Sequence, residues 1–345
     1  MARPIRTTSL LLALALSAAP AAGAQVAYDS PEGRVEVLGL HGWTLQMLRD
    51  SVRKHRPGTE LHDAACMVVL REDLGFADAL VQTRHVQMRP DAEPETFLVI
   101  KVVEPAEAAR VVWRTLPADT FTILRPEYAP VVLPVTDSAG GFWRSRILDP
   151  LQFYARPDEE RAHAFAGPPG RRADAERLFA FLQARRTEVD RRRARAVLAG
   201  DRFYVNRMMA AAVLANFPGH DSTWHALADA LRDPHEAVRA AAESVLGSLP
   251  ARPVDWAPAR ETLRLLLGGT NVGASSDLMR VLAATDIDPA LAAPLLRGNA
   301  AWILEHARAE NPMDRLSARM LLARLSGLPA AETTDEAWAR WAAAL

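Results

Sequence analysis

The most closely spaced histidines and carboxylates of the chain lie between positions 220 and 236. His220 and Asp221 are followed by His225 and Asp229, and His235-Glu236 comes shortly after. His225 and Asp229 are four positions apart, which places them on one face of a helix, and both residue types can bind zinc. Neither an H-E-x-x-H motif nor a cysteine pair accompanies them. The pattern therefore favours an ordinary solvated helix face, and we expect neither a metal site nor a cofactor.

Other familiar catalytic motifs are missing from the sequence. It contains no G-x-S-x-G nucleophile elbow and no phosphate-binding loop. The run Asp137-Ser138-Ala139-Gly140-Gly141 favours a plain turn, because no Lys or Ser/Thr follows it as in a phosphate loop. Cys66, the single cysteine, lies in an apolar run and is expected to be a buried, inert thiol. We therefore expect a protein that is not an enzyme.

One enzymatic alternative stays open from the sequence. Residues 105–170 have no clear architecture, and a secreted hydrolase or metal-dependent enzyme would have its site there. The candidate side chains for this alternative are those of Asp137, Trp143, Arg144 and Arg146.

The densest basic run has the residue type that binds phosphate groups. It consists of Arg185, Arg186, Arg191, Arg192, Arg193 and Arg195. Consecutive arginines on a helix point in different directions, and Glu188 stands four positions before Arg192, as in a solvated helix with ion pairs. The whole chain has 41 Lys and Arg against 42 Asp and Glu, so it lacks the basic field of a nucleic-acid-binding protein. We expect a structural role for the run and no nucleic-acid partner.

The N-terminus has the order of a secretory signal peptide. Arg3 and Arg6 precede the apolar residues 10–16, and the small residues Ala22-Gly23-Ala24 follow. The apolar stretch is shorter than the ~20 residues of a membrane-spanning helix. We expect residues 1–24 to be removed near Ala24, and a mature protein that is periplasmic or secreted, without a transmembrane segment.

Residues 34–104 read as a small α+β domain. Polar and apolar residues alternate over 34–38, which predicts a half-buried strand. Two helical patterns follow, one with Leu45, Leu48 and Val52 and one over 63–74 with Gly75 at its end. Residues 79–86 and 97–103 then predict two more strands.

The element order strand, helix, helix, strand, strand resembles a POTRA domain. The best-matching parts are residues 35–39, Leu74-Gly75-Phe76 and Val102-Val103-Glu104. POTRA domains usually have Asn after the glycine that follows the first strand, whereas Leu40 follows Gly39 here. The resemblance implies a periplasmic module of transport or assembly proteins. An unrelated α+β domain with the same order is the alternative.

Between the two halves, residues 105–170 form a proline-rich region of mixed character. The runs 111–113, 121–124 and 131–135 predict short strands interrupted by prolines. Gly167-Pro168-Pro169-Gly170 predicts a linker or a sharp boundary. Beyond it the pattern is helical, beginning with a predicted helix over 173–198.

An internal repeat marks the helical half, residues 171–345. A shift of 32 residues aligns Asp201 with Asp233 and Arg207 with Arg239, together with Val213-Leu214, Val245-Leu246 and two prolines. This pattern closely resembles the HEAT repeat, in which the Asp and Arg fix the turn and the contact to neighbouring repeats. The resemblance implies an α-helical solenoid of about four repeats. Its structural repeat positions are Asp201, Arg207, Asp233, Pro234, Val238, Arg239, Ala242 and Leu246.

Together these patterns predict a two-part fold and a binding function. The end of the chain, with Trp338 and Trp341, resembles the terminal helix that covers the last repeat of bacterial HEAT proteins. In the predicted register Ala242, Val245 and Leu246 are buried, and Arg232 and Glu243 are exposed. We expect an exported scaffold or adaptor that binds a protein or peptide partner, and a helical half that folds without the N-terminal part.

Overall fold

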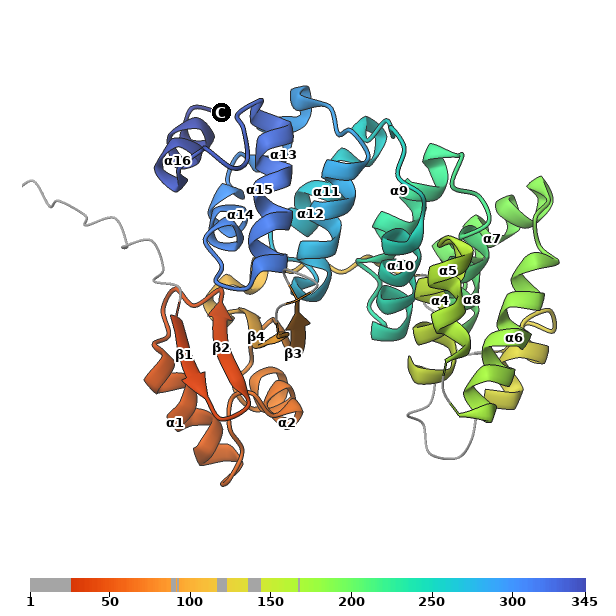
Figure 1. Cartoon of the computed structure of the whole chain (residues 1–345), viewed down its shortest axis with the longest axis horizontal. Coiled ribbons are helices and arrows are strands. Elements are labelled where there is room, and N and C mark those ends of the chain that lie inside the picture. Colours follow the sequence, from red (N-terminus) through yellow and green to blue (C-terminus); the bar gives the residue numbers. More distant parts are fainter. Residues whose placement is uncertain (1–25, 88–90, 92, 117–122, 136–143, 167) are drawn as a thin grey trace, which may run out of the picture.

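The protein consists of a small four-stranded sheet with two helices and a larger helical region (Figure 1). The computed structural model describes residues 26–87, 91, 93–116, 123–135, 144–166 and 168–345. The predicted signal peptide and the run from Asp137 to Gly141 lie outside the described residues. Among the helices that are described, none has the length and hydrophobicity needed to cross a membrane.

The sheet has the strand order β1-β2-β4-β3. Its strands are β1 (Val26–Ser30), β2 (Gly33–Leu38), β3 (Asp78–Val86) and β4 (Glu95–Val103). The central strands β2 and β4 run parallel, and each outer strand runs antiparallel to its neighbour. The predicted order is present as β2, α1, α2, β3 and β4. The prediction missed β1, which forms a hairpin with β2 through a turn at residues 31 and 32. Gly33 follows this turn, and a side chain there would collide with the Thr96 carbonyl.

Two helices cover one face of this sheet. Helix α1 (Leu45–His55) begins after Thr44, whose hydroxyl accepts a hydrogen bond from the Met47 N–H at 3.2 Å. Helix α2 (Ala64–Val68) continues into a π-helical turn, Val69–Asp73, and the left-handed Gly75 ends it. Cys66 is buried, and burial raises the pKa of its thiol to about 12, which keeps it protonated and inert.

The predicted strands of the region that follows are wrong. Residues 131–135 are helical, in α3 (Ala129–Val132) and the 3-10 turn Leu133–Val135, because Val131 and Val135 then share one buried face. Residues 111–113 are extended but pair with no strand among the described residues, since the backbone of this segment bonds to helix ends instead. Of residues 121–124 only the last two are described, and they belong to no strand.

Helices account for the rest of the described chain. Between the sheet and the helical half lie the 3-10 turn Pro105–Arg110, the π-helical turn Arg144–Leu148, α4 (Asp149–Tyr154), α5 (Asp158–Arg161) and the 3-10 turn Ala162–Phe165. The helical half contains α6 (Pro169–Gln183), α7 (Glu188–Gly200), α8 (Tyr204–Leu214), α9 (Asp221–Ala230), α10 (Glu236–Ser248), α11 (Arg260–Leu267), α12 (Ser275–Ala284), α13 (Ala292–Leu296), α14 (Ala300–Ala307), α15 (Pro312–Ser326) and α16 (Asp335–Ala343).

Two sequence boundaries change in the structure. The single helix predicted over 173–198 is the pair α6 and α7, because Thr187 and Asp190 form a reciprocal capping box that starts a new helix. The predicted linker around residue 168 is the start of α6, since Pro169 occupies its first turn.

Repeated hydrogen bonds accompany the repeated sequence. Arg207 and Arg239 each donate from Nη1 to the two backbone carbonyls that lie six and five positions earlier, at 2.8 to 3.1 Å. Arg315 makes the same pair of contacts at 2.8 and 3.0 Å. Asp201 and Asp233 each accept from the backbone N–H two positions later. The 32-residue shift in the sequence therefore matches a recurring turn geometry.

The burial of α10 agrees with its predicted stripe. Val238, Ala242, Val245 and Leu246 are all buried in the core of the helical region. The predicted exposure is wrong in one respect, because Arg232 and Glu243 are half-buried against neighbouring elements.

Replacement of Leu246 by Ala is expected to lower the free energy of unfolding by about 2 to 5 kcal/mol, because it leaves a cavity in this core. The matched control is Ser244→Ala on the same helix, which removes one half-buried hydroxyl. Chemical denaturation of both variants measures the effect. A Leu246→Ala curve that overlays the Ser244→Ala curve would contradict the expected packing.

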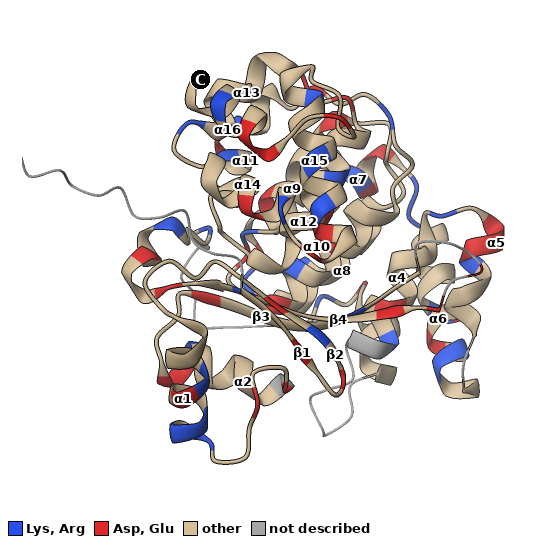
Figure 2. Ribbon diagram, turned by 60° about the vertical axis from the view of Figure 1, so that its left-hand side comes forward, with Lys and Arg blue, Asp and Glu red and all other residues tan. Residues whose placement is uncertain are grey.

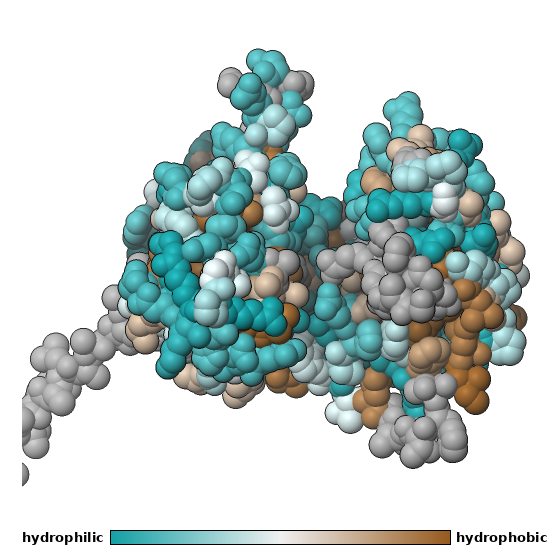
Figure 3. Space-filling model, turned by 90° about the horizontal axis from the view of Figure 1, so that it is seen from below, coloured by the Kyte–Doolittle hydropathy of each residue, from teal (hydrophilic) through white to brown (hydrophobic). Residues whose placement is uncertain are grey.

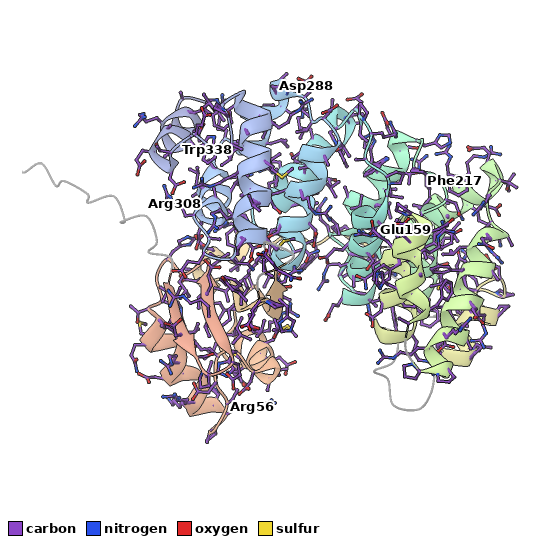
Figure 4. The ribbon with its side chains drawn as sticks, in the orientation of Figure 1. Arg56, Glu159, Phe217, Asp288, Arg308 and Trp338 are labelled. Carbon is purple, nitrogen blue, oxygen red and sulfur yellow. The ribbon has the colours of Figure 1, made fainter. Side chains whose placement is uncertain are left out.

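The last helix, α16, brings one tryptophan into the core. Trp338 is fully buried, and the Arg319 guanidinium lies 5.3 Å from its ring centroid (Figure 4). Trp341 packs against the same core while remaining half-buried. These contacts place α16 against α14 at the end of the helical region.

Candidate functional site

The second face of the sheet packs against the helical region. The sheet lies between α1 and α2 on one side and the helices on the other (Figure 2). At the centre of this junction, the Lys101 ammonium group of β4 lies 2.6 Å from the Asp314 carboxylate of α15. The two side chains are 0% and 2% exposed. A buried ion pair therefore joins two parts of the chain that the sequence predicted to be separate.

The residue types around this pair are those of nucleophilic catalysis. Lys101 Nζ donates to Ser276 Oγ at 2.8 Å, and Ser275 Oγ lies 3.0 Å from His306 Nε2. Burial, followed by the nearby charge of Lys101, lowers the pKa of His306 to about 4, so the ring is neutral. Burial favours the protonated form of Asp314, but the charge of Lys101, together with that of His306 and the hydrogen bonds from Lys101 and Ser276, lowers the pKa to about 2. The cluster thus holds one full ion pair at neutral pH.

This cluster connects elements and does not act on a substrate. Each of its members is at most 5% exposed, so no substrate reaches the serines or the histidine. Reasoning from the sequence missed it, because Lys101 and Asp314 are 213 positions apart and no short motif contains them.

Two further carboxylates hold the same junction. Glu36 of β2 is buried and accepts from the backbone N–H groups of Glu310 and Asn311 at the start of α15. In the opposite direction, Glu305 of α14 accepts from the Gly39 N–H at 2.6 Å. Burial raises the pKa of Glu305 above its usual value. Backbone N–H donors of each part are therefore satisfied by a carboxylate of the other part.

An extended segment ties the sheet to the turns of the helical region. The guanidinium of Arg114 contacts Asp233, Asp229 at 3.2 Å and the Leu198 carbonyl at 2.7 Å. Asp233 also receives two hydrogen bonds of 2.8 Å from Arg207. Burial favours the neutral acid, yet the bonds from Arg207 and the charge of Arg114 hold the pKa of Asp233 below its usual value. Two arginines from different elements thus share one repeat-turn carboxylate.

The histidines and carboxylates between 220 and 236 are dispersed. Asp221 pairs with Arg252, and His225 Nε2 lies 2.6 Å from the Asp255 carbonyl. His235 stacks on the Tyr204 ring at a centroid distance of 3.5 Å. Among the described residues, no three metal-ligating side chains form a group that could hold an ion.

Of the four residues of the hydrolase alternative, the structure describes the side chain of Arg146. Arg146 pairs with Asp174, which is 3% exposed, and so stabilises α6. Asp137 and Trp143 lie outside the described residues. The grouping of the four side chains therefore stays a prediction.

A recess separates the lobe of the sheet from the lobe formed by α4 to α6 (Figure 3). Strand β3 forms the edge of the sheet on that side and faces α10 (Figure 1). The Ala79 backbone points outward from this edge, because its carbonyl accepts from Arg71 and its N–H donates to the Asp78 side chain. In an antiparallel strand every second residue points the same way. Val81, Thr83 and His85 therefore present their backbone N–H and C=O groups at the edge.

These edge groups have no hydrogen-bond partner among the described residues. The side chains of Thr83 and His85 are exposed, so water or a ligand reaches the backbone there. The remainder of the edge is closed, since Arg71 covers Ala79 and the Gly273 turn lies against Leu80.

Charged side chains of α10 and α12 lie close to this edge. Glu243 of α10 is near Arg84 of β3 and near Asp277 of α12. Asp277 also accepts from Arg280 at 3.0 Å. Burial, followed by the charge of Asp277, raises the pKa of Glu243 to about 7. The wall of the recess is therefore polar, with both signs of charge.

Comparison with known proteins found no matching family model, no similar curated protein and no similar solved structure. The geometry described above is therefore the basis for the proposed function.

Proposed function

We propose that this protein is an exported, non-enzymatic scaffold or adaptor that binds an extended peptide segment of a protein partner in the cell envelope. The sequence order of the first 24 residues supports export. The proposal takes the helical half as a HEAT-like solenoid and the sheet as a POTRA-like module. The repeated arginine contacts and the element order support these assignments.

The open part of β3 is the observation that carries the proposal. An extended peptide adds to such an edge as a further strand, and its backbone bonds to the unpaired groups of Val81, Thr83 and His85. Main-chain bonds supply affinity that depends little on sequence. The side chains of the bound strand alternate between the two faces of the sheet, and every second one faces the recess.

The recess adds selectivity to this edge. Glu243, Asp277 and Arg84 place hydrogen-bonding groups where side chains of the added strand arrive. A long apolar side chain would remove water from these groups without replacing its hydrogen bonds, which is unfavourable. We therefore expect peptides with polar residues at the positions that face the recess.

Replacement of Thr83 by Pro is expected to abolish peptide binding while the sheet stays folded. The Thr83 N–H points away from β4, so proline removes a donor of the open edge and no bond of the ladder. The matched control is Thr83→Val, which keeps the N–H and the branched side chain. Peptides selected from a displayed random library on the full-length protein serve as ligands, and fluorescence anisotropy measures their affinity.

The same peptides with N-methylated backbone amides test the mechanism from the ligand side. A peptide that binds by strand addition loses its backbone donors on methylation, so the methylated peptide should bind wild type weakly. The unmethylated peptide should likewise bind the Thr83→Pro variant weakly. Peptides that bind Thr83→Pro and wild type equally well would contradict strand addition at β3. Circular dichroism of both variants establishes that the sheet is intact.

A further inference from the structure

An open groove lies between alternate helices of the helical half. It has a volume of about 560 Å³ and is lined by α7, α9 and the start of α11. This volume lies within the range of ligand sites, about 300 to 1,000 Å³. The basic run of α7 and the histidine group of α9 meet here, because Arg192, Arg195, Ser222 and His225 all line the groove.

The charge of the groove is positive and only partly compensated. The side chain of Arg195 forms no ion pair or hydrogen bond among the described residues, and its Nε is buried without a partner. Arg192 lies 3.9 Å from Glu188, which is a weak, exposed contact. Asp229, the carboxylate in the lining, is engaged by Arg114 at 3.2 Å and by Arg232 at 3.5 Å. The guanidinium of Arg195 is therefore a cation of the lining that no carboxylate of the described residues engages.

The remaining lining decides which kind of anion fits. The floor of the groove is formed by the small side chains of Ala196, Ala199 and Ala226. They leave room for the backbone of a ligand or for an aliphatic stem. A guanidinium binds a carboxylate in a bidentate manner, with two parallel N–H···O bonds. The His225 ring is held in place by its 2.6 Å contact with the Asp255 carbonyl. The lining thus combines one fixed polar rim with a small apolar floor.

We propose that this groove binds a carboxylate group carried on a short aliphatic stem, as in the acidic side chains of a peptide, with Arg195 as its principal partner. The stem lies over the alanines of α7 and α9, and the carboxylate accepts from Arg195 and from Arg192 at the rim. This site lies on different elements from the β3 edge and does not depend on strand addition.

The test uses the full-length protein and two labelled peptides, Ac-Ala-Glu-Ala-Glu-Ala-NH2 and its Gln counterpart. Fluorescence anisotropy measures their binding. The Glu peptide is expected to bind and the Gln peptide to bind at least about tenfold more weakly, since a hydrogen bond to a charged group contributes that much. Arg195→Gln should cause a comparable loss for the Glu peptide. The matched control is Arg186→Gln, which removes an exposed arginine outside the groove and should leave binding unchanged.

A second variant distinguishes binding in the groove from a general attraction by positive charge. Ala196→Leu fills the floor without changing the charge, and binding should fall about tenfold if the stem occupies that space. Free glutarate distinguishes the source of the carboxylate. If glutarate displaces the peptide at similar concentration, the site takes small free acids; if much more is required, it takes peptides. Equal binding of the Glu and Gln peptides, or unchanged binding in Arg195→Gln and Ala196→Leu, would overturn the proposal.

Discussion

Residues 171–345 expressed alone are expected to lack a cooperative melt and to bind hydrophobic dyes, contrary to the separation expected from the sequence. The buried side chains of Tyr128, Ile147, Leu151 and Tyr154 belong to the same core as the helices of this fragment. Burial of each such side chain contributes about 1.5 to 3 kcal/mol. Their loss together approaches the whole stability of a typical domain, about 5 to 15 kcal/mol.

A longer fragment is the control for this experiment. Residues 105–345 keep the core contributed by α3 and α4 and lose the sheet domain. This fragment should show a cooperative transition at a temperature below that of the full chain, because it exposes Trp302 and Val272 at the former junction. Circular dichroism and dye binding compare the two. A stable, monomeric 171–345 fragment would show that residues 105–170 only lie on a core that is complete without them.

Replacement of Lys101 by Met is expected to lower the free energy of unfolding by about 3 to 5 kcal/mol. The variant leaves the Asp314 carboxylate buried without its cation, and removing one partner of a buried ion pair has this effect. The shape of the side chain is nearly preserved, so the loss is electrostatic in origin. Chemical denaturation at neutral pH measures it.

The double variant Lys101→Met with Asp314→Asn provides the control, because no unpaired charge remains. It should recover a large part of the lost stability. The pH dependence checks the same pair. The folded pKa of Asp314, about 2, lies below the unfolded value near 3.9, so its stabilisation is complete above the unfolded value and is lost as pH falls towards 2. A double variant as unstable as Lys101→Met would contradict the assignment of the loss to the unpaired carboxylate.

The sequence predicted features that depend on local patterns. Alternation identified β2 and β4, a strand-like run identified β3, and the apolar stripe of α10 identified Val245 and Leu246 as buried. Asp201 and Arg207 recur 32 residues later as Asp233 and Arg239, and this recurrence predicted positions that make repeated turn contacts in the structure. These features depend on residue patterns that recur within the length of about one helix pair. Such patterns can be recognised in a single sequence.

Features that depend on distant parts of the chain were not predicted. The valines of residues 131–135 have branched side chains typical of strands, yet this segment is helical because Pro130 lies in the first turn of α3 and Val131 and Val135 pack into the core of the helical region. To predict the open edge of β3, the strand order of the sheet and the position of Arg71 must be known, and the sequence shows neither. The basic run of α7 and the histidines of α9 were recognised in the sequence as two unrelated polar groups, and the sequence did not predict that they line one groove.

The pairing of Lys101 with Asp314 imposes an order on the biosynthesis of the chain. Lys101 leaves the ribosome 213 residues before Asp314. At about 5 to 20 residues per second, this interval lasts roughly 10 to 40 s. During that time, β2 and β4 can pair, but the ammonium group that belongs in the junction still faces water. The last helices to be synthesised therefore complete the first domain to emerge, and a nascent chain released early keeps one face of its sheet uncovered.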